Sequence, residues 1–131
     1  MTSRSWKRHT GSIAWPTIAL FGVVTLGTAA VWWSALAGQL PLWAGGGLQT
    51  VFAYLAFTVA HEAAHGNVHG KARALKPLAE AAGWLSSAIL FAPFPAFRVL
   101  HLQHHSHVNE ADADPDHWVA SSSAPGVAAR C

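Results

Sequence analysis

The 131-residue chain has the length of one domain, but 52% hydrophobic and only 11% charged residues set it apart from an ordinary soluble domain. A net charge of +2, without a basic stripe interleaved with aromatics, argues against a nucleic-acid partner. The single cysteine, Cys131, excludes an internal disulfide and argues against a cysteine-based zinc or iron–sulfur site. No Asp, Glu, Lys or Arg occurs between Arg8 and Glu62, so the sequence predicts an all-α integral membrane protein.

Two apolar stretches predict two transmembrane helices, over about residues 13–36 and about residues 42–60. At about 1.5 Å of rise per residue, the first is long enough to cross the hydrocarbon layer with some tilt. The first stretch is preceded by three basic residues, Arg4, Lys7 and Arg8. The positive-inside rule therefore places the N-terminus in the cytoplasm. A cleaved signal peptide is the alternative interpretation, but more apolar sequence follows and the stretch exceeds the usual 7 to 15 residues.

A third apolar stretch, about residues 82–97, is short for a span and contains Pro93 and Pro95, which interrupt a regular helix. If this stretch crossed the membrane, the histidines on its two sides would be separated by about 30 Å. We therefore expect an interfacial or re-entrant segment, with the polar loop 67–80 and everything after it on the cytoplasmic side. Residues 1–118 form the predicted membrane domain. Residues 119–131, rich in Ser, Ala, Pro and Gly, are expected to form a disordered tail.

The residues able to carry chemistry lie in two histidine clusters. The first is the segment His61-Glu62-Ala63-Ala64-His65-Gly66, at the cytoplasmic end of the second predicted span. The second is the segment His101-Leu102-Gln103-His104-His105. Helical positions i, i+3 and i+4 lie on one side of the axis, so each cluster directs its imidazoles one way. Imidazole is a good ligand for iron and zinc. Histidine and glutamate side chains at the end of a transmembrane helix cost free energy unless they have a function. The clusters therefore predict a metal site.

The first cluster alone allows two other interpretations. His61-Glu62-x-x-His65 matches the signature of zinc metallopeptidases, in which both histidines bind zinc and the glutamate acts as a base. Such an enzyme needs three protein ligands and one open position, which leaves the second cluster unexplained. The other interpretation is a membrane protein that binds or handles metal ions without catalysis.

Taken together, the two clusters and residues 109–116 resemble the membrane fatty acid desaturase superfamily, over about residues 13–118. Relatives in that superfamily include carotenoid hydroxylases and ketolases and alkane hydroxylases, which stay alternatives here. The resemblance implies a non-haem centre of two iron ions that uses dioxygen to take hydrogen from an unactivated C–H bond of a fatty acyl or other lipid substrate. It also implies the lipid bilayer as surroundings, and an external electron carrier and reductase.

The resemblance also assigns roles to single residues. The expected metal ligands are His61 and His65 of the first histidine box, and His101, His104 and His105 of the second. Glu62 is expected to orient a ligand imidazole through a hydrogen bond or to take part in the chemistry directly. His69 and His107 lie outside the boxes and are further candidate ligands. The turn Asp114-Pro115-Asp116 is expected to fix the loop beside the second box, whereas His9 and His117 are predicted to be surface residues.

The sequence departs from the family pattern in one respect. The family has a third histidine box, and no such element follows the second box before Cys131. The prediction is therefore an N-terminal part of a lipid desaturase that is inactive alone. It would be completed by a missing C-terminal half or by another chain of an oligomer.

Overall fold

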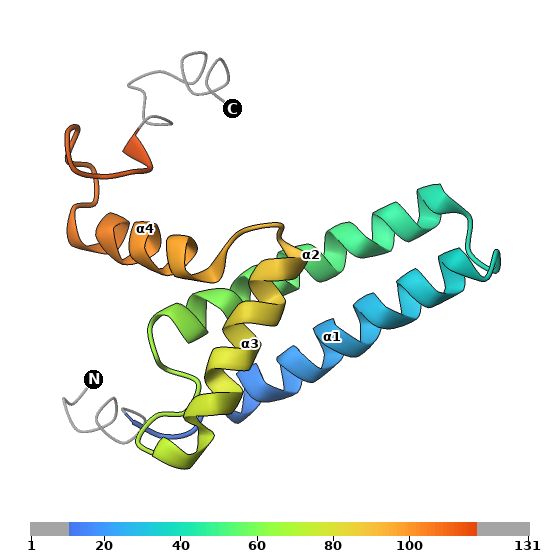
Figure 1. Cartoon of the computed structure of the whole chain (residues 1–131). Helices are drawn as coiled ribbons and strands as arrows, with labels where there is room; N and C mark the ends of the chain where they lie inside the picture. The colour runs from blue at the N-terminus through green and yellow to red at the C-terminus, as the bar shows by residue number, and fades with distance from the viewer. Residues whose placement is uncertain (1–10, 118–131) are drawn as a thin grey trace, which may run out of the picture.

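The computed structural model describes residues 11–117, which form helices and connecting turns without a strand. In chain order the elements are α1 (Trp15–Leu36), α2 (Leu42–Ala64), the short 3-10 helix η2 (Arg73–Leu75), α3 (Lys76–Ile89) and α4 (Phe94–Ser106). Figure 1 shows α1 and α2 side by side along the length of the molecule, with α3 and α4 gathered near one end. His9 and the predicted tail lie outside the described residues. The predicted all-helical fold is confirmed for the described part.

The α1–α2 hairpin provides two helices that are long and apolar enough to cross a membrane, as predicted. Pro16 lies in the first turn of α1, where its fixed φ suits a helix start. Gly38, with a φ of 70°, turns the chain between the two helices. Gly27 on α1 packs directly against the ring of Phe52 on α2, leaving no room for a side chain at that position. Small residues of this kind let membrane helices approach closely.

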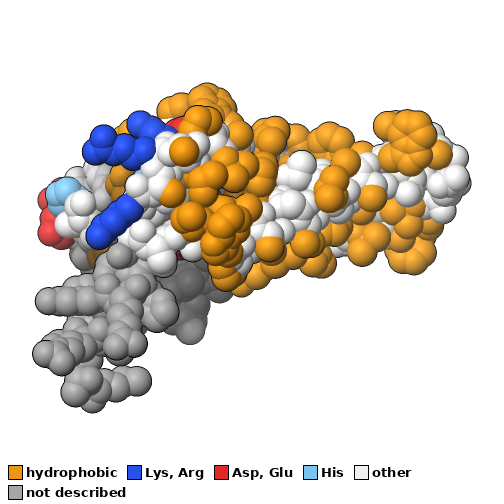
Figure 2. Space-filling model, turned by 90° about the horizontal axis from the view of Figure 1, so that it is seen from below, with side chains coloured by type: hydrophobic (Ala, Val, Ile, Leu, Met, Phe, Trp, Pro, Cys, Tyr) orange, Lys and Arg blue, Asp and Glu red, His pale blue; other side chains and the backbone are white. Residues whose placement is uncertain are grey.

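The surface of the hairpin is apolar. Figure 2 shows hydrophobic side chains spread along the elongated part of the molecule, while Lys, Arg, Asp, Glu and His gather at one end. Among the large exposed side chains are Leu26, Trp33, Leu42 and Trp43, each more than 70% exposed. The buried positions in these helices are smaller, such as Val24 and Ala56. An exposed apolar surface of this extent fits hydrocarbon rather than water, so the chain is an integral membrane protein.

The third apolar stretch forms two helices instead of one segment. Helix α3 begins at Lys76, inside the region expected to be a polar loop, and ends at Ile89. The chain then turns through Phe91, which has a φ of 57°, and α4 leaves at 95° to α3. Pro95 lies in the first turn of α4, where the missing N–H removes no helical hydrogen bond. The prolines therefore mark the start of a second helix.

A small core at the charged end of the molecule joins the helices. Phe94 is 1% exposed, and its ring fills the space above Gly83, so α3 and α4 meet closely after the bend. The same core contains Ala63, Ala64, Val68 and Ala79, with Ile18 and Phe97 packed against it. This packing holds α4 against the end of α2 and determines where the second histidine box lies.

Candidate metal centre

The first histidine box lies on the last turns of α2. His61 and His65 are one helical turn apart, and His65 caps a helix that ends at Ala64. Gly66 adopts a φ of 70°, and the backbone N–H groups of Gly66 and Asn67 donate to carbonyls of the last turn. The helix therefore stops directly after the box, and His69 is not on the same helical face.

Four imidazoles from the two boxes converge. His61 and His65 on α2 and His101 and His105 on α4 each offer a ring nitrogen within 4.8 Å of the others. His101 Nε2 lies 3.0 Å from His65 Nε2 and 3.1 Å from His105 Nε2. Ligand nitrogens at about 2.1 Å from a metal ion and at right angles to one another are separated by roughly 3.0 Å. The two spacings at His101 thus fit adjacent positions around one metal ion, and the other nitrogens of this four-histidine group lie within 4.8 Å.

Burial and mutual repulsion keep two of these imidazoles neutral. The pKa of His101 is lowered to about 4, first by burial and then by the neighbouring His61, His105, His65 and His104. The pKa of His65 is lowered by burial first and then by His61 and His105. Because a neutral imidazole has a free lone pair, both rings are available as metal ligands at neutral pH.

Glu62 contacts the first ligand of the group. With the proton on Nδ1, His61 donates to Glu62 Oε1 across 3.1 Å, which leaves Nε2 as its metal-binding atom. Asn67 Nδ2 donates to the other carboxylate oxygen, Oε2, across 3.0 Å. These two contacts hold Glu62 beside His61, and its orienting role stays a prediction. No sequence pattern pointed to Asn67, because its contact depends on the turn that ends α2.

Aromatic side chains orient His101. The ring of Phe97, one turn earlier on α4, stacks on the imidazole with centroids 5.3 Å apart and planes within 5° of parallel. Phe57 of α2 meets the Phe97 ring edge-on at 5.9 Å. These rings restrict rotation of the imidazole and exclude water from one of its faces. The helical spacing of four residues between Phe97 and His101 was a signal that could have identified the contact.

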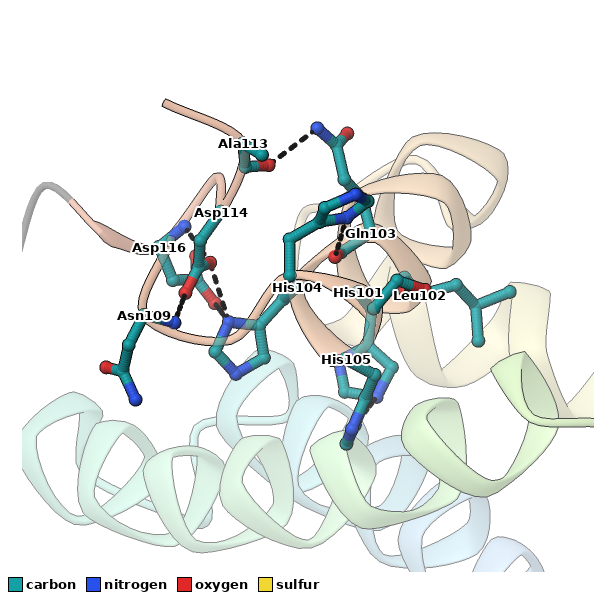
Figure 3. Close-up of polar contacts among 11 residues, drawn as sticks. His101, Leu102, Gln103, His104, His105, Asn109, Ala113, Asp114 and Asp116 are labelled. Carbon is teal, nitrogen blue, oxygen red and sulfur yellow. Dashed lines mark hydrogen bonds and ion pairs between the residues drawn. The ribbon is translucent and has the colours of Figure 1, made fainter. Parts of the chain in front are cut away.

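The remaining residue of the second box, His104, does not belong to the four-histidine group. Its ring lies beside the loop that follows α4 (Figure 3). His104 Nδ1 is 2.8 Å from Asp114 Oδ1, and Asp116 Oδ2 lies farther away, at 3.6 Å. The hydrogen bond to Asp114 raises the pKa of His104 and lowers the pKa of Asp114 to about 2. The rings of His104 and His105 are 5.7 Å apart between centroids, so His104 adjoins the four-histidine group.

The loop after α4 is organised around Asp114, which is 8% exposed. Its Oδ2 accepts from the backbone N–H of Asn109, and its Oδ1 accepts from the backbone N–H of Asp116, each across 2.9 Å. Gln103 Nε2 donates to the Ala113 carbonyl across 2.8 Å and ties the loop to α4 (Figure 3). These bonds agree with the expected loop-fixing role of the turn. One ligand atom each from His104, Asp114 and Asp116 also lie within 4.8 Å of one another.

The other described histidines lie outside both groups. With its proton on Nδ1, His69 donates to the Gly70 carbonyl across 2.8 Å, and its ring lines a cavity of about 270 Å³ that also borders His65. His107 Nδ1 is 3.2 Å from the Gln103 carbonyl oxygen. His117, predicted at the surface, is half-buried, and its Nδ1 has no hydrogen-bond partner within residues 11–117.

The comparisons with known proteins bear on this arrangement. A family model described as Fatty acid desaturase matches residues 32–130, which is most of the chain and contains both histidine boxes. No curated protein and no solved structure gives a match. The matched family has iron-dependent chemistry on lipid substrates, which agrees with a histidine-rich group at one end of an apolar hairpin. The chain belongs to the fatty acid desaturase family.

Proposed function

We propose that this chain is part of a membrane non-haem di-iron desaturase that oxidises a lipid with dioxygen. The observation that carries the proposal is the convergence of four imidazoles from two separate histidine boxes, in a chain of the desaturase family. Nitrogen ligands suit iron, and the spacing of about 3 Å from His101 Nε2 to the Nε2 atoms of His65 and His105 fits adjacent positions around one ion. Carotenoid and alkane oxidation by the same kind of centre are the related alternatives.

The proposed ligands divide into two sets. His61, His65, His101 and His105 would hold one iron ion, and His104 would present Nε2 to a second. Bound iron would supply the activation of dioxygen that C–H oxidation requires. The chain's own residues fix the imidazoles: Glu62 holds the Nδ1 proton of His61, and Phe97 orients the ring of His101. We expect no direct ligation by His69 or His107, because neither offers a ring nitrogen to the four-histidine group or to the group formed by His104, Asp114 and Asp116.

We also infer that α3 and α4 form a re-entrant pair, so that both boxes face the cytoplasm. His101 on α4 contacts His65 at the end of α2, and the entry to α3 is tied to the start of α1, where Lys71 N–H donates to the Gly11 carbonyl. Both ends of the α3–α4 pair thus lie at the same end of the α1–α2 hairpin. If the α3–α4 pair crossed the membrane, its first and last residues would lie at opposite ends of the α1–α2 hairpin.

The side chains of α3 support immersion in the bilayer. Its exposed face is apolar, with Trp84 53% and Leu85 47% exposed, whereas Ser86 and Ser87 are fully buried against the neighbouring helices. This is the reverse of the pattern on a helix facing water. The basic residues Lys71, Arg73 and Lys76 precede this face and are exposed, as expected for the cytoplasmic boundary.

We propose that this chain needs further ligands and helices for lipid oxidation. The boxes within residues 11–117 supply five imidazoles, which leaves one of two iron ions short of nitrogen ligands. A tunnel for an acyl chain needs walls from more helices than α1 to α4 provide. The remainder would come from another segment or from a second chain, and electrons from an external carrier and reductase.

A zinc metallopeptidase is a second candidate with weaker support. Its glutamate must be free to act as a base, but both carboxylate oxygens of Glu62 are engaged, by His61 and by Asn67. His101 and His105 would also crowd a zinc ion that needs an open position.

Metal selectivity tests the proposal. The full chain, purified anaerobically in detergent, is equilibrated with iron(II) and zinc(II) separately, then assayed for bound metal, dioxygen consumption with a reductant, and peptide cleavage. Iron-dependent dioxygen consumption that His101→Ala abolishes supports the proposal. One tightly held zinc ion with peptide cleavage, unaffected by His101→Ala, would contradict it.

A further inference from the structure

We propose that Asp114 is a positioning residue for a metal ligand, because it holds the imidazole of His104 with Nε2 free to bind. This inference rests on the proposed function, in which His104 binds iron. The sequence suggested only that the turn containing Asp114 shapes the loop. The structure adds a direct contact from its carboxylate to the ring.

The burial and bonding of Asp114 carry the first step. A carboxylate that is 8% exposed is costly unless hydrogen-bond donors compensate for lost water. Three donors do so: His104 Nδ1 at 2.8 Å, and the backbone N–H groups of Asn109 and Asp116 at 2.9 Å each. The carboxylate is therefore fixed from the loop side and offers Oδ1 to the ring in one orientation. Figure 3 shows these contacts converging on Asp114.

The second step concerns the imidazole. When Nδ1 carries the proton that Asp114 accepts, Nε2 has the lone pair, and the ring cannot rotate without breaking a short hydrogen bond. A carboxylate on the far nitrogen also makes an imidazole a stronger metal ligand. Glu62 makes the same kind of contact with His61 Nδ1, so each box contains one histidine backed by a carboxylate.

The neighbouring Asp116 provides the comparison within the same turn. Its side chain is 63% exposed and its Oδ2 lies 3.6 Å from His104 Nδ1, beyond a normal hydrogen bond. Its carboxylate has the same charge and nearly the same position in sequence, but not the contact. If the acidic turn acted only through its negative charge, replacing Asp114 or Asp116 would weaken metal binding equally. If Asp114 acts by positioning His104, only the replacement of Asp114 would weaken it.

A double-mutant cycle on metal binding tests the inference. The probes are cobalt(II), followed by its visible absorption, and iron(II) in competition, with the full chain in detergent. With the four-histidine group already loaded, Asp114→Asn should weaken binding of the second metal ion, the one proposed beside His104, about 10- to 100-fold in the otherwise native chain. In a His104→Ala background the same change should have an effect of less than about threefold, since no ring is left to position. Asp116→Asn is the matched control and should stay within about threefold.

Nitrogen-15 spectra of labelled histidine give a readout that needs no metal. At about pH 9, above the ordinary histidine range, His104 should carry its proton on Nδ1, and Asp114→Asn should move a large share of it to Nε2. An equal loss of metal binding in both backgrounds would show a merely structural role, misfolding included, and would overturn the inference. An unchanged tautomer would overturn it as well. If His104→Ala leaves the binding of this second metal ion intact, the failure lies in the ligand role proposed for His104, and the inference falls with it.

Discussion

At the scale of single residues, histidines that look equivalent in the sequence have different surroundings. The spacing of His101, His104 and His105 predicts one helical face, and the structure brings only the first and last of them to the four-histidine group. The reason is the loop after α4, whose Asp114 holds His104 at its own side. Helical periodicity indicated which histidines lie on the same side of α4. The contact between His104 and Asp114 joins a helix to a later loop, and no sequence period predicts such a contact.

Replacing single histidines with Ala should distinguish the metal ligands from the other histidines by the loss of metal affinity. Replacing any member of the four-histidine group with Ala removes a nitrogen that converges with three others, so metal affinity should fall by more than the roughly 100-fold typical of an indirect partner. Cobalt(II) titration of each variant measures the change. His107→Ala and His117→Ala serve as controls and should change affinity by less than about threefold. Similar losses at the control positions would mean that the ligand set is wrongly assigned.

The ion pair between His104 and Asp114 should weaken both at low pH, where Asp114 is protonated, and at high pH, where His104 loses its proton. The pKa of Asp114 is lowered from 3.8 to about 2, so its stabilising effect is complete above 3.8 and is lost as pH falls through about 2. The pKa of His104 is raised above 6.5, so its effect is complete below 6.5 and is lost as pH rises through the higher value. The metal-free ion pair should therefore be strongest between about pH 4 and 6.5.

Hydrogen exchange of the Asn109 amide, corrected for intrinsic rates, measures this dependence because that amide donates to Asp114. Protection should be greatest inside the window and should fall toward pH 2. In Asp114→Asn the corrected protection should be low and nearly independent of pH. Native protection that stays constant down to pH 2 would contradict the assignment.

At the scale of helices, the sequence was informative where local chemistry decides the structure. The run without charged residues predicted both α1 and α2. The start of α3 at Lys76 was missed, because Lys76 and Glu80 gave the segment the polar appearance of a loop. The 95° bend before α4 depends on packing between residues distant in sequence, so the two prolines indicated only a break.

Packing at that bend gives a stability prediction. A Cβ atom on Gly83 would occupy the space of the Phe94 ring, so Gly83→Ala should destabilise the chain by about 1–3 kcal/mol, the usual cost of overpacking a core. Unfolding by a denaturing detergent, followed by circular dichroism, measures it. Gly46→Ala on α2 is the matched control, because no neighbouring atom lies within 4 Å of its added Cβ. We expect a change within about 0.5 kcal/mol there, and equal effects at both positions would argue against the α3–α4 contact.

At the scale of the whole molecule, the proposed topology makes both boxes accessible from the cytoplasm. After Cys131→Ser, single cysteines at the exposed positions Gln39, Arg73 and Glu110 can be labelled with a reagent that does not cross membranes. Arg73→Cys and Glu110→Cys should react only from the cytoplasmic side, and Gln39→Cys only from the other. Reaction of Glu110→Cys from the same side as Gln39→Cys would place the two boxes on opposite faces and would refute a shared metal centre.

The ligand count predicts what the 131-residue chain does by itself. Four histidines converge on one position and His104 lies beside them. Under the proposed function, the described residues would therefore hold one iron ion and supply only part of the ligands of a second. The chain should therefore bind no more than about one iron tightly, and without a second iron and an enclosed path for an acyl chain it should not turn over lipid. Imidazoles left without iron should take up other divalent ions in the Irving–Williams order.

Iron per chain, together with product formation from candidate lipids in the presence of dioxygen and a reductant, tests this prediction. The oligomeric state of the same sample in detergent is measured alongside. Two tightly bound iron ions per chain with turnover would overturn it. If that sample were also oligomeric, mixing His104→Ala chains with chains that lack the four-histidine group would show the source of the missing ligands. Restored activity in the mixture requires that one chain contributes imidazoles to a centre on its neighbour, because neither variant then holds a full set.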